Sequence, residues 1–251
     1  MTGSIWEWEW DLDLDLVASI ELAALLEGEK PRLRWEADIN HIRRLKSRLK
    51  GTGFALWQPG LEVLGRGPTE AGDRFVHLRP VTPGGCHGEL FYVGRHGDAE
   101  LQRLAALERV TPGHPEIGAL LGYPACCVAA YPMLAAAGSW VGALLGASPQ
   151  AAAGWASCND LATFLDIRAR LFDWFPCRLD CPVAHALRLR WLASARARGL
   201  GEQIDAAMRV RAVPLLVSPA GLSPLDEGLP VVRMPTGLEG ERLLRWRRGL
   251  S

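Results

Sequence analysis

The chain lacks several features that would assign it to a large class of proteins. No apolar run approaches the roughly 20 residues that a membrane-spanning helix requires, and the start carries no basic-then-apolar signal segment. We therefore expect a cytoplasmic protein without a membrane partner. Cysteines in such a reducing compartment are more often metal ligands or redox thiols than structural disulfides.

The 251 residues also carry no excess charge, because 28 Lys and Arg balance 28 Asp and Glu. Nucleic-acid-binding proteins usually show a basic excess or patch, so we predict no nucleic-acid partner. The charges are nevertheless unevenly distributed along the chain. The first 30 residues contain eight acids and one Lys, whereas the end is basic at Arg242, Arg245, Arg247 and Arg248.

Familiar catalytic signatures are absent as well. The sequence has no Gly-x-Ser-x-Gly elbow, phosphate-binding loop, dinucleotide-binding fingerprint or His-Glu-x-x-His motif. A hydrolase, a kinase or a nicotinamide-dependent enzyme is therefore poorly supported, and the sequence assigns no catalytic residue.

Residues 6–16 alternate between large apolar and acidic side chains. A period of two is typical of a β-strand with one buried and one solvated face. This strand is either part of the protein's own sheet or an arm that pairs with a peptide or another chain by strand addition. Homodimerisation through the same strand is the nearest alternative. Because tryptophan is frequent at binding hot spots, the candidate peptide-binding residues are Trp6, Glu7, Trp8, Glu9, Trp10 and Asp11.

The hydrophobic pattern predicts an α+β protein, with a mixed or antiparallel sheet in its N-terminal half and a mainly helical C-terminal half. The N-terminal half, residues 1–110, is expected to hold helices at 16–26, 38–50 and 98–110, and strands at 31–36, 53–58, 61–64, 75–81 and 89–93. In residues 111–251 we expect helices near 115–122, 124–137, 139–146, 159–173 and 182–198. Strands at 212–218 and 229–234 follow, and 240–248 is expected as a short helix or a tail. The boundary between the two regions is soft.

The helix expected over 38–50 is amphipathic. Its apolar stripe consists of Ile39, Ile42, Leu45 and Leu49, and we interpret the basic run opposite as a solvated face. That run consists of Arg43, Arg44, Lys46, Arg48 and Lys50.

Four of the six cysteines stand in two short pieces, residues 120–127 and 175–182. Each piece contains a proline, Pro124 or Pro182, that suits the first turn of a helix, and Asp180 is expected to cap the second helix. A thiolate at such a position is favoured by the positive end of the helix dipole. The sequence thus predicts two helix starts, each carrying a pair of cysteines.

The chemistry of these cysteines has three interpretations. Four thiolates could hold Zn²⁺ or an iron–sulfur cluster, although neither piece has the common Cys-x-x-Cys spacing. Two disulfides between the pieces, or a redox pair, would satisfy the same pattern, and so would buried free thiols. Adjacent helical residues point about 100° apart, so one cysteine of the first pair could belong to the core. The candidate ligands are Cys126, Cys127, Cys177 and Cys181.

The remaining cysteines and histidines give weaker signals. Cys86 and His87 follow a Pro-Gly-Gly turn that could carry a ligand, and Cys158 is expected to pack before a helix. His114 stands shortly before the first cysteine pair. His185 follows Cys181 by four residues, hence on the same helical face, and could act as a ligand or a general base.

The segment from Glu116 through Gly122-Tyr123-Pro124-x-Cys126-Cys127 to Tyr131 resembles one in functionally uncharacterised prokaryotic proteins. In those proteins a Gly-Tyr-Pro-x-Cys-Cys element precedes a Pro-Cys-x-x-x-Cys element, which corresponds here to residues 176–181. The combination is also similar to accessory proteins of ribosomal-peptide natural-product clusters of the crocagin kind. This resemblance implies a peptide-binding guide for precursor modification and supplies no catalytic residues. One departure is that Arg178-Leu179-Asp180 stands where the related element has Ser-Pro-Asp.

Two functional hypotheses follow. The first is a peptide-binding accessory protein that guides precursor-peptide modification in natural-product biosynthesis, with a peptide or protein partner. The alternative is a metal enzyme (Zn or Fe–S) or a dithiol redox enzyme that acts at the cysteine cluster. A structural subunit whose cysteines only pack is a third possibility.

Overall fold

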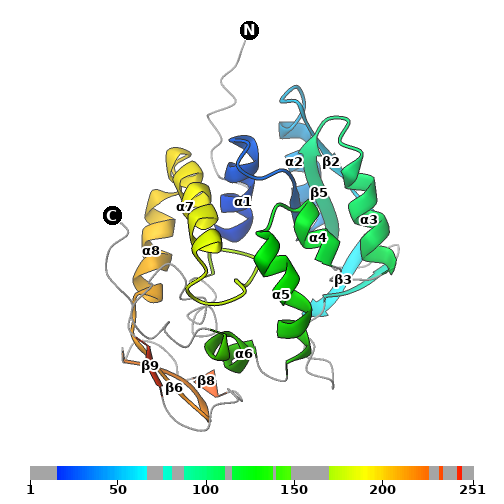
Figure 1. Cartoon of the computed structure of the whole chain (residues 1–251). Coiled ribbons are helices and arrows are strands. Elements are labelled where there is room, and N and C mark those ends of the chain that lie inside the picture. The colour runs from blue at the N-terminus through cyan, green and yellow to red at the C-terminus, as the bar shows by residue number, and fades with distance from the viewer. Residues whose placement is uncertain are drawn as a thin grey trace. The chain divides into compact units, whose positions relative to one another are not determined.

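The computed structural model describes residues 16–66, 76–80, 88–110, 115–137, 140–147, 170–225, 232–233 and 242–244 (Figure 1). The chain forms two compact units, residues 1–123 and 124–251. The division lies after the predicted soft boundary at 110, because the helix at 115–120 packs with the preceding helix in the first unit.

The described part of the first unit follows the predicted order of elements closely. Its helices are α1 (Leu16–Leu26), α2 (Ile39–Arg48), α3 (Glu100–Val110) and α4 (Pro115–Leu120). Its strands are β1 (Leu33–Ala37), β2 (Phe54–Trp57), β3 (Leu61–Arg66), β4 (Val76–Pro80) and β5 (Glu89–Arg95).

Strand β5 is the centre of the first sheet. Along one edge it pairs with β1, in the register Leu33↔Val93. Along the other edge it pairs first with β3 at Glu62↔Glu89 and then with β2, and β4 extends the sheet from β3. Every strand pair described in this sheet is antiparallel, which confirms the predicted α+β class.

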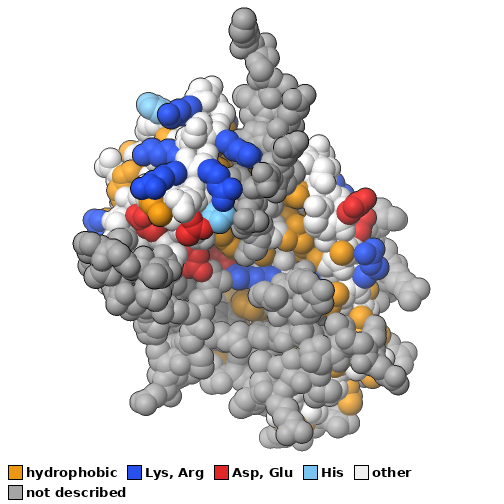
Figure 2. Space-filling view, turned by 180° about the vertical axis from the view of Figure 1, so that it is seen from behind, with side chains coloured by type: hydrophobic (Ala, Val, Ile, Leu, Met, Phe, Trp, Pro, Cys, Tyr) orange, Lys and Arg blue, Asp and Glu red, His pale blue; other side chains and the backbone are white. Residues whose placement is uncertain are grey.

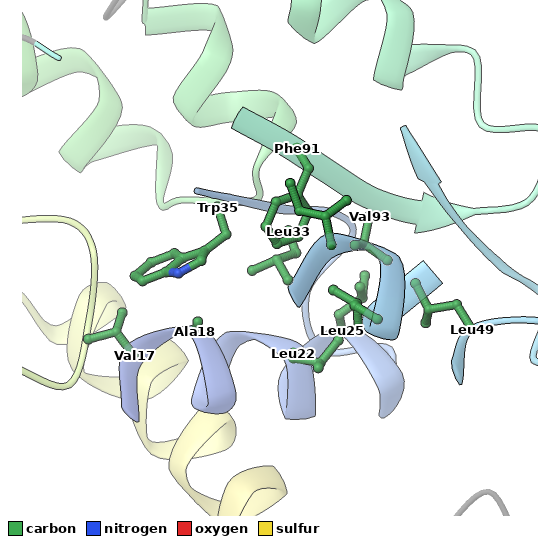
Figure 3. Packing of buried hydrophobic residues seen from close by; sticks show 11 residues of the cluster. Val17, Ala18, Leu22, Leu25, Leu33, Trp35, Leu49, Phe91 and Val93 are labelled. Atoms are coloured by element: carbon green, nitrogen blue, oxygen red, sulfur yellow. The ribbon is translucent and has the colours of Figure 1, made fainter. Parts of the chain in front are cut away.

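Alternate residues of β5 enter two different apolar clusters. Phe91 and Val93 pack with α1 and α2, whereas Leu90 and Tyr92 pack with α3 and α4. This alternation follows from the period of two in a strand. Helices therefore cover both faces of the sheet, and Figure 3 shows Trp35 and Leu33 of β1 facing the apolar side of α1.

Helix α1 is buried at every position from Val17 to Leu25. Because it is apolar on nearly all sides, it belongs inside the unit. Its one charged residue, Glu21, is 1% exposed and pairs with the equally buried Lys30, whose Nζ lies 3.4 Å from the carboxylate. A buried charge needs such a partner.

Helix α2 begins after Asp38, whose carboxylate accepts hydrogen bonds from the backbone N–H groups of Asn40 and His41. Ile42 and Leu45 face the core, whereas the prediction was wrong for Ile39, which is 41% exposed in the first turn of the helix. The five basic side chains from Arg43 to Lys50 are exposed, as the solvated-face interpretation predicted, and they gather on one surface of the first unit (Figure 2).

The last residues of the first unit are fixed by the segment before β1. Lys30 donates to the carbonyl of Leu121 at 3.1 Å, and Arg32 donates to that of Leu120 at 2.8 Å. These are carbonyls at the end of α4, which have no partner within the helix. Gly122 has φ +82° and lies against the ring of Pro31, so the Gly-Tyr-Pro element requires a residue without a side chain here.

The described part of the second unit contains four helices and a small sheet. The helices are α5 (Ala125–Ala136), α6 (Trp140–Gly146), α7 (Pro182–Ala197) and α8 (Gly201–Arg211). The strands are β6 (Leu215–Ser218), β7 (Gly221–Pro224), β8 (Val232–Arg233) and β9 (Arg242–Leu244), in the order β8-β7-β6-β9.

Four features of this unit differ from the prediction. The helix predicted over 159–173 is wrong at 170–173, which are not helical, and its other residues lie outside the described ones. Helix α8 was missed, although Ile204, Ala207 and Arg211 are buried at helical spacing. Strand β7 was also missed; it lies between β6 and β8, so the two predicted late strands do not pair with each other. The short helix or tail predicted over 240–248 is wrong at 242–244, where β9 pairs antiparallel with β6.

Residues 170–181 form an irregular segment that is nevertheless largely buried. Arg188 of α7 is 1% exposed, and its guanidinium carbon lies 4.6 Å from the ring centroid of Phe172 and 4.4 Å from that of Trp174. The same guanidinium donates to the carbonyl of Trp174 at 2.8 Å. Cation–π contacts of this kind are strong when they are desolvated, so Arg188 fixes the segment to α7.

Candidate metal centre

The first cysteine pair stands in the first turn of α5. Pro124 occupies the N-cap position, and its carbonyl accepts the backbone N–H of Cys127 at 2.9 Å. No side chain caps this helix start. The sequence-based placement of both cysteines at a helix start is therefore confirmed.

The second pair is divided between the irregular segment and α7. Cys177 lies in the segment, and Cys181 is the N-cap of α7, with Pro182 in the first turn as predicted. Asp180 was the predicted cap, and this was wrong. The cap is Cys181, whose own Sγ accepts the backbone N–H of Ala184 at 3.5 Å.

The structure brings all four predicted cysteines together. The Sγ of Cys126 lies 3.7 Å from that of Cys181 and 3.9 Å from that of Cys127, and the Cys127–Cys181 distance is 4.0 Å. All four Sγ atoms are within 4.8 Å of one another. A disulfide bond is about 2.05 Å long, so in this structure the four cysteines are free thiols. The sulfurs of both adjacent cysteines lie in this cluster, and Cys127 is also buried at 4% exposure, as predicted for one of the pair.

Burial and hydrogen bonding differ among the four thiols. Cys127 and Cys181 are buried, Cys177 is half-buried and Cys126 is exposed. The Sγ of Cys127 accepts the backbone N–H of Cys177 at 3.3 Å, as that of Cys181 does from Ala184. Backbone donors of this kind stabilise thiolates and orient metal ligands.

The pKa values of the thiols are linked. Burial raises the pKa of Cys127 far above its usual range and that of Cys177 to about 12, and the neighbouring thiols add to both shifts. For Cys181 burial acts in the same direction, but hydrogen bonds from Ala184 and the other three thiols outweigh it and lower the pKa. Four adjacent thiolates repel one another, whereas a cation at their centre would replace the protons.

His185 is the remaining predicted site residue in this region that the structure describes. It lies one turn into α7, and the cluster of possible metal ligands in the described part of the chain does not include it. Burial, with a smaller effect from Arg188, lowers the pKa of His185, so its imidazole is neutral near pH 7.

The other predicted site residues lie outside the described residues. This applies to Cys86, His87, His114 and Cys158, and to the peptide-binding residues Trp6, Glu7, Trp8, Glu9, Trp10 and Asp11. Peptide binding and dimerisation through the N-terminal strand thus stay predictions. What the sequence missed at the centre is the pair of backbone donors, Cys177 N–H and Ala184 N–H, which no residue pattern reveals.

Four clustered cysteines could hold a metal such as zinc or an iron–sulfur centre. None of the helices in the described part of the chain has the length and apolar character needed to cross a membrane. No protein-family model matches the chain, and neither the curated proteins nor the solved structures gave a significant match.

Proposed function

We propose that the second unit binds a single metal ion, Zn²⁺ by preference, through Cys126, Cys127, Cys177 and Cys181, and that the ion has a structural role. The observation that carries this proposal is the spacing of the four sulfurs. It extends the metal alternative drawn from the sequence and leaves the enzymatic part of that alternative aside.

The sulfur separations among Cys126, Cys127 and Cys181 match a tetrahedron around one ion, and the Cys177 sulfur is within 4.8 Å of the others. With Zn–S bonds of about 2.3 Å, the corners of a tetrahedral site are roughly 3.8 Å apart. Three of the separations in the structure are 3.7, 3.9 and 4.0 Å. A cluster of several irons places iron and sulfide atoms between the thiolates and spreads them more widely, so the spacing favours one ion over a cluster.

The ligand set favours a structural role over catalysis. Catalytic zinc sites usually keep one coordination position for water or substrate, whereas structural sites use four protein ligands. Here the four thiolates would complete the coordination. They also join the start of α5 to the irregular segment and the start of α7, three separate pieces of the second unit.

We prefer zinc to a single iron because the proposed role is structural and needs no redox change at the metal. Zn²⁺ has no redox chemistry and accepts tetrahedral thiolate coordination without strain. A mononuclear iron site would satisfy the same geometry, and the metal analysis below distinguishes the two.

The test is metal analysis of the full-length protein purified without oxygen, beside Cys127→Ser and Cys181→Ser variants. We expect one zinc ion per wild-type chain and less than a tenth of that in each variant. Cys86→Ser and Cys158→Ser are matched controls that should retain the full amount. Replacement of the ion by Co²⁺ should give the strong visible absorption of a tetrahedral thiolate site.

Other outcomes would overturn the proposal. Iron with acid-labile sulfide in stoichiometric amounts would mean a cluster and not a single ion. Protein without metal, and unable to take up Zn²⁺ or Co²⁺ with all its thiols reduced, would mean that the four cysteines only pack.

A further inference from the structure

The four thiols of the centre differ in their access to solvent. Cys126 is exposed, whereas Cys127 and Cys181 are buried to 4% and 2% exposure and Cys177 is half-buried. An attacking molecule therefore reaches the sulfur of Cys126 more readily than the other three. Susceptibility of cysteine to oxidation follows thiolate character and exposure.

The thiols also differ in backbone hydrogen bonding. The sulfurs of Cys127 and Cys181 each accept a backbone N–H, from Cys177 and Ala184. Among the described residues, the contacts of the Cys126 sulfur are with Cys127 and Cys181, and no backbone N–H donates to it. A hydrogen bond to a thiolate stabilises its charge and reduces its nucleophilicity. Among the described residues no backbone N–H donates to the sulfur of Cys126 or of Cys177, and Cys126 is the more exposed of these two.

We infer that Cys126 is an oxidative modification site through which hydrogen peroxide, or a similar two-electron oxidant, opens the metal centre, with Cys181 as the resolving thiol. This inference rests on the proposed function. It assigns to the centre a second property, regulated release of its ion, that a purely structural site does not need.

The chemistry balances with the named oxidant. The Cys126 thiolate attacks one peroxide oxygen, the O–O bond breaks, and hydroxide leaves, which gives a sulfenic acid. The Cys181 thiolate then attacks the Cys126 sulfur, the S–O bond breaks, and a second hydroxide leaves as the disulfide forms. Two thiolates thus lose two electrons, peroxide gains them, and the two hydroxides take up protons from the solvent to give water.

The geometry selects Cys181 over Cys127 as the resolving residue. Neighbouring Cα atoms are about 3.8 Å apart, shorter than the roughly 4.4–6.8 Å of ordinary disulfides, so a Cys126–Cys127 bond does not fit within α5. The sulfur of Cys181 is 3.7 Å from that of Cys126 and comes from a different element. A Cys126–Cys181 bond would remove two of four ligands at once, and the remaining two thiols would hold the ion weakly.

The experiment uses the full-length zinc-loaded protein and a stepwise titration with hydrogen peroxide. A chromogenic chelator reports released zinc, dimedone traps sulfenic acid, and fragment-ion mass spectrometry separates Cys126 from Cys127. We expect about one zinc released per peroxide consumed, dimedone on Cys126, and a Cys126–Cys181 disulfide. Dithiothreitol followed by added zinc should restore the metal content, and Cys86→Ser and Cys158→Ser should behave as wild type.

A second measurement does not depend on variants of the ligands. Short pulses of iodoacetamide on the zinc-loaded wild-type protein should label Cys126 at least ten times faster than Cys127, Cys177 or Cys181. Equal labelling of the four, a first sulfenic acid on another cysteine, or zinc that stays bound through the titration would overturn the inference. Protein that contains no zinc before peroxide is added would instead refute the proposed function, so the two failures are distinguishable.

Discussion

The two units fix their irregular segments by different means. In the first unit, residues 30–32 are held by cations that find complementary groups in the same unit: Lys30 meets Glu21, and Arg32 forms a two-point contact with Asp98. In the second unit, residues 170–181 are held by Arg188 between aromatic rings and by four thiols. The first set of contacts is made by the chain's own charged side chains, whereas under the proposed function the four thiolates are completed by a metal ion.

The two irregular segments differ in the side chains that hold them. A segment without a ladder of backbone hydrogen bonds must be fixed by side chains, and the chemistry of those side chains decides what the segment responds to. We expect the first unit to lose stability when an ion-pair partner is removed. The second unit should lose stability when metal is removed or the thiols are oxidised.

If the second unit binds zinc as proposed, the largest expected effect comes from removing the metal. Structural zinc contributes an apparent binding free energy of about 10–16 kcal/mol in zinc-finger peptides, more than any single packing contact. Cys127→Ser, or a strong chelator, should therefore abolish hydrogen-exchange protection at the starts of α5 and α7 and leave α1 and β1 unchanged. Hydrogen-exchange mass spectrometry of the full chain measures this, with Cys158→Ser as the control. Equal loss of hydrogen-exchange protection in both units would show that the cysteine site does not stabilise the second unit in particular.

The next effect concerns the buried ion pair of the first unit. Lys30→Met leaves the carboxylate of Glu21 buried without this cation, and it should destabilise the first unit by about 3–5 kcal/mol. Glu21→Leu combined with Lys30→Met removes both charges and should recover much of that loss. Urea unfolding of the two variants and the wild type checks the prediction. A double variant as unstable as the single one would show that loss of the Glu21–Lys30 ion pair does not cause the destabilisation.

A smaller effect is expected at Gly122. A Cβ at this position would lie 2.5 Å from Cδ of Pro31, and the residue has φ +82°. Gly122→Ala should thus cost about 2–4 kcal/mol, from the left-handed conformation and the clash together. Gly51 has a similar φ of +77° with nothing within 4 Å, so Gly51→Ala is the matched control for the conformational part. If the two variants unfold at the same urea concentration, the contact with Pro31 contributes nothing.

The smallest effect is a pH dependence of the first unit. Burial lowers the pKa of Lys30 below 10.5, against the opposing effect of Glu21. Between the lowered value and 10.5 the unfolded chain binds more protons at this residue than the folded chain does. The contribution of Lys30 to the free energy of unfolding therefore rises with pH in that window.

Urea midpoints measured at pH 8 and pH 10 test this dependence. The rise seen in the wild type should be reduced in Lys30→Met, which has no titrating group at this position. Identical pH profiles for the two proteins would show that Lys30 does not carry the effect.

Much of the fold was predictable because its signals are local. The central strand β5 and helix α2 follow directly from the periodicity of their apolar residues, and both were placed within a few residues. Helix α8 escaped prediction although its periodicity is present, because one of its buried positions is Arg211 and not an apolar residue. Residues 242–244 of strand β9 were predicted as part of a short helix or a tail, because three residues are too few to show a period. Only the pairing with β6 defines this strand.

The candidate site was predictable in part for the same reason. Helix starts carrying Cys126, Cys127 and Cys181 follow from Pro124 and Pro182, which are local signals. The sequence could not show that α7 is capped by Cys181 and not by Asp180. The capping depends on where the partners of the Cys181 sulfur hold it.

The sequence by itself determined the period of most of the longer elements and the positions of two helix starts. It also placed four thiols at or near those helix starts. Only the tertiary structure decided that thiols some 50 positions apart meet at 3.7–4.0 Å, and that Cys126 is the exposed one. The physical reason is that backbone conformation responds to neighbours within a few residues, whereas the approach of distant side chains depends on how the irregular segment 170–181 packs against α7.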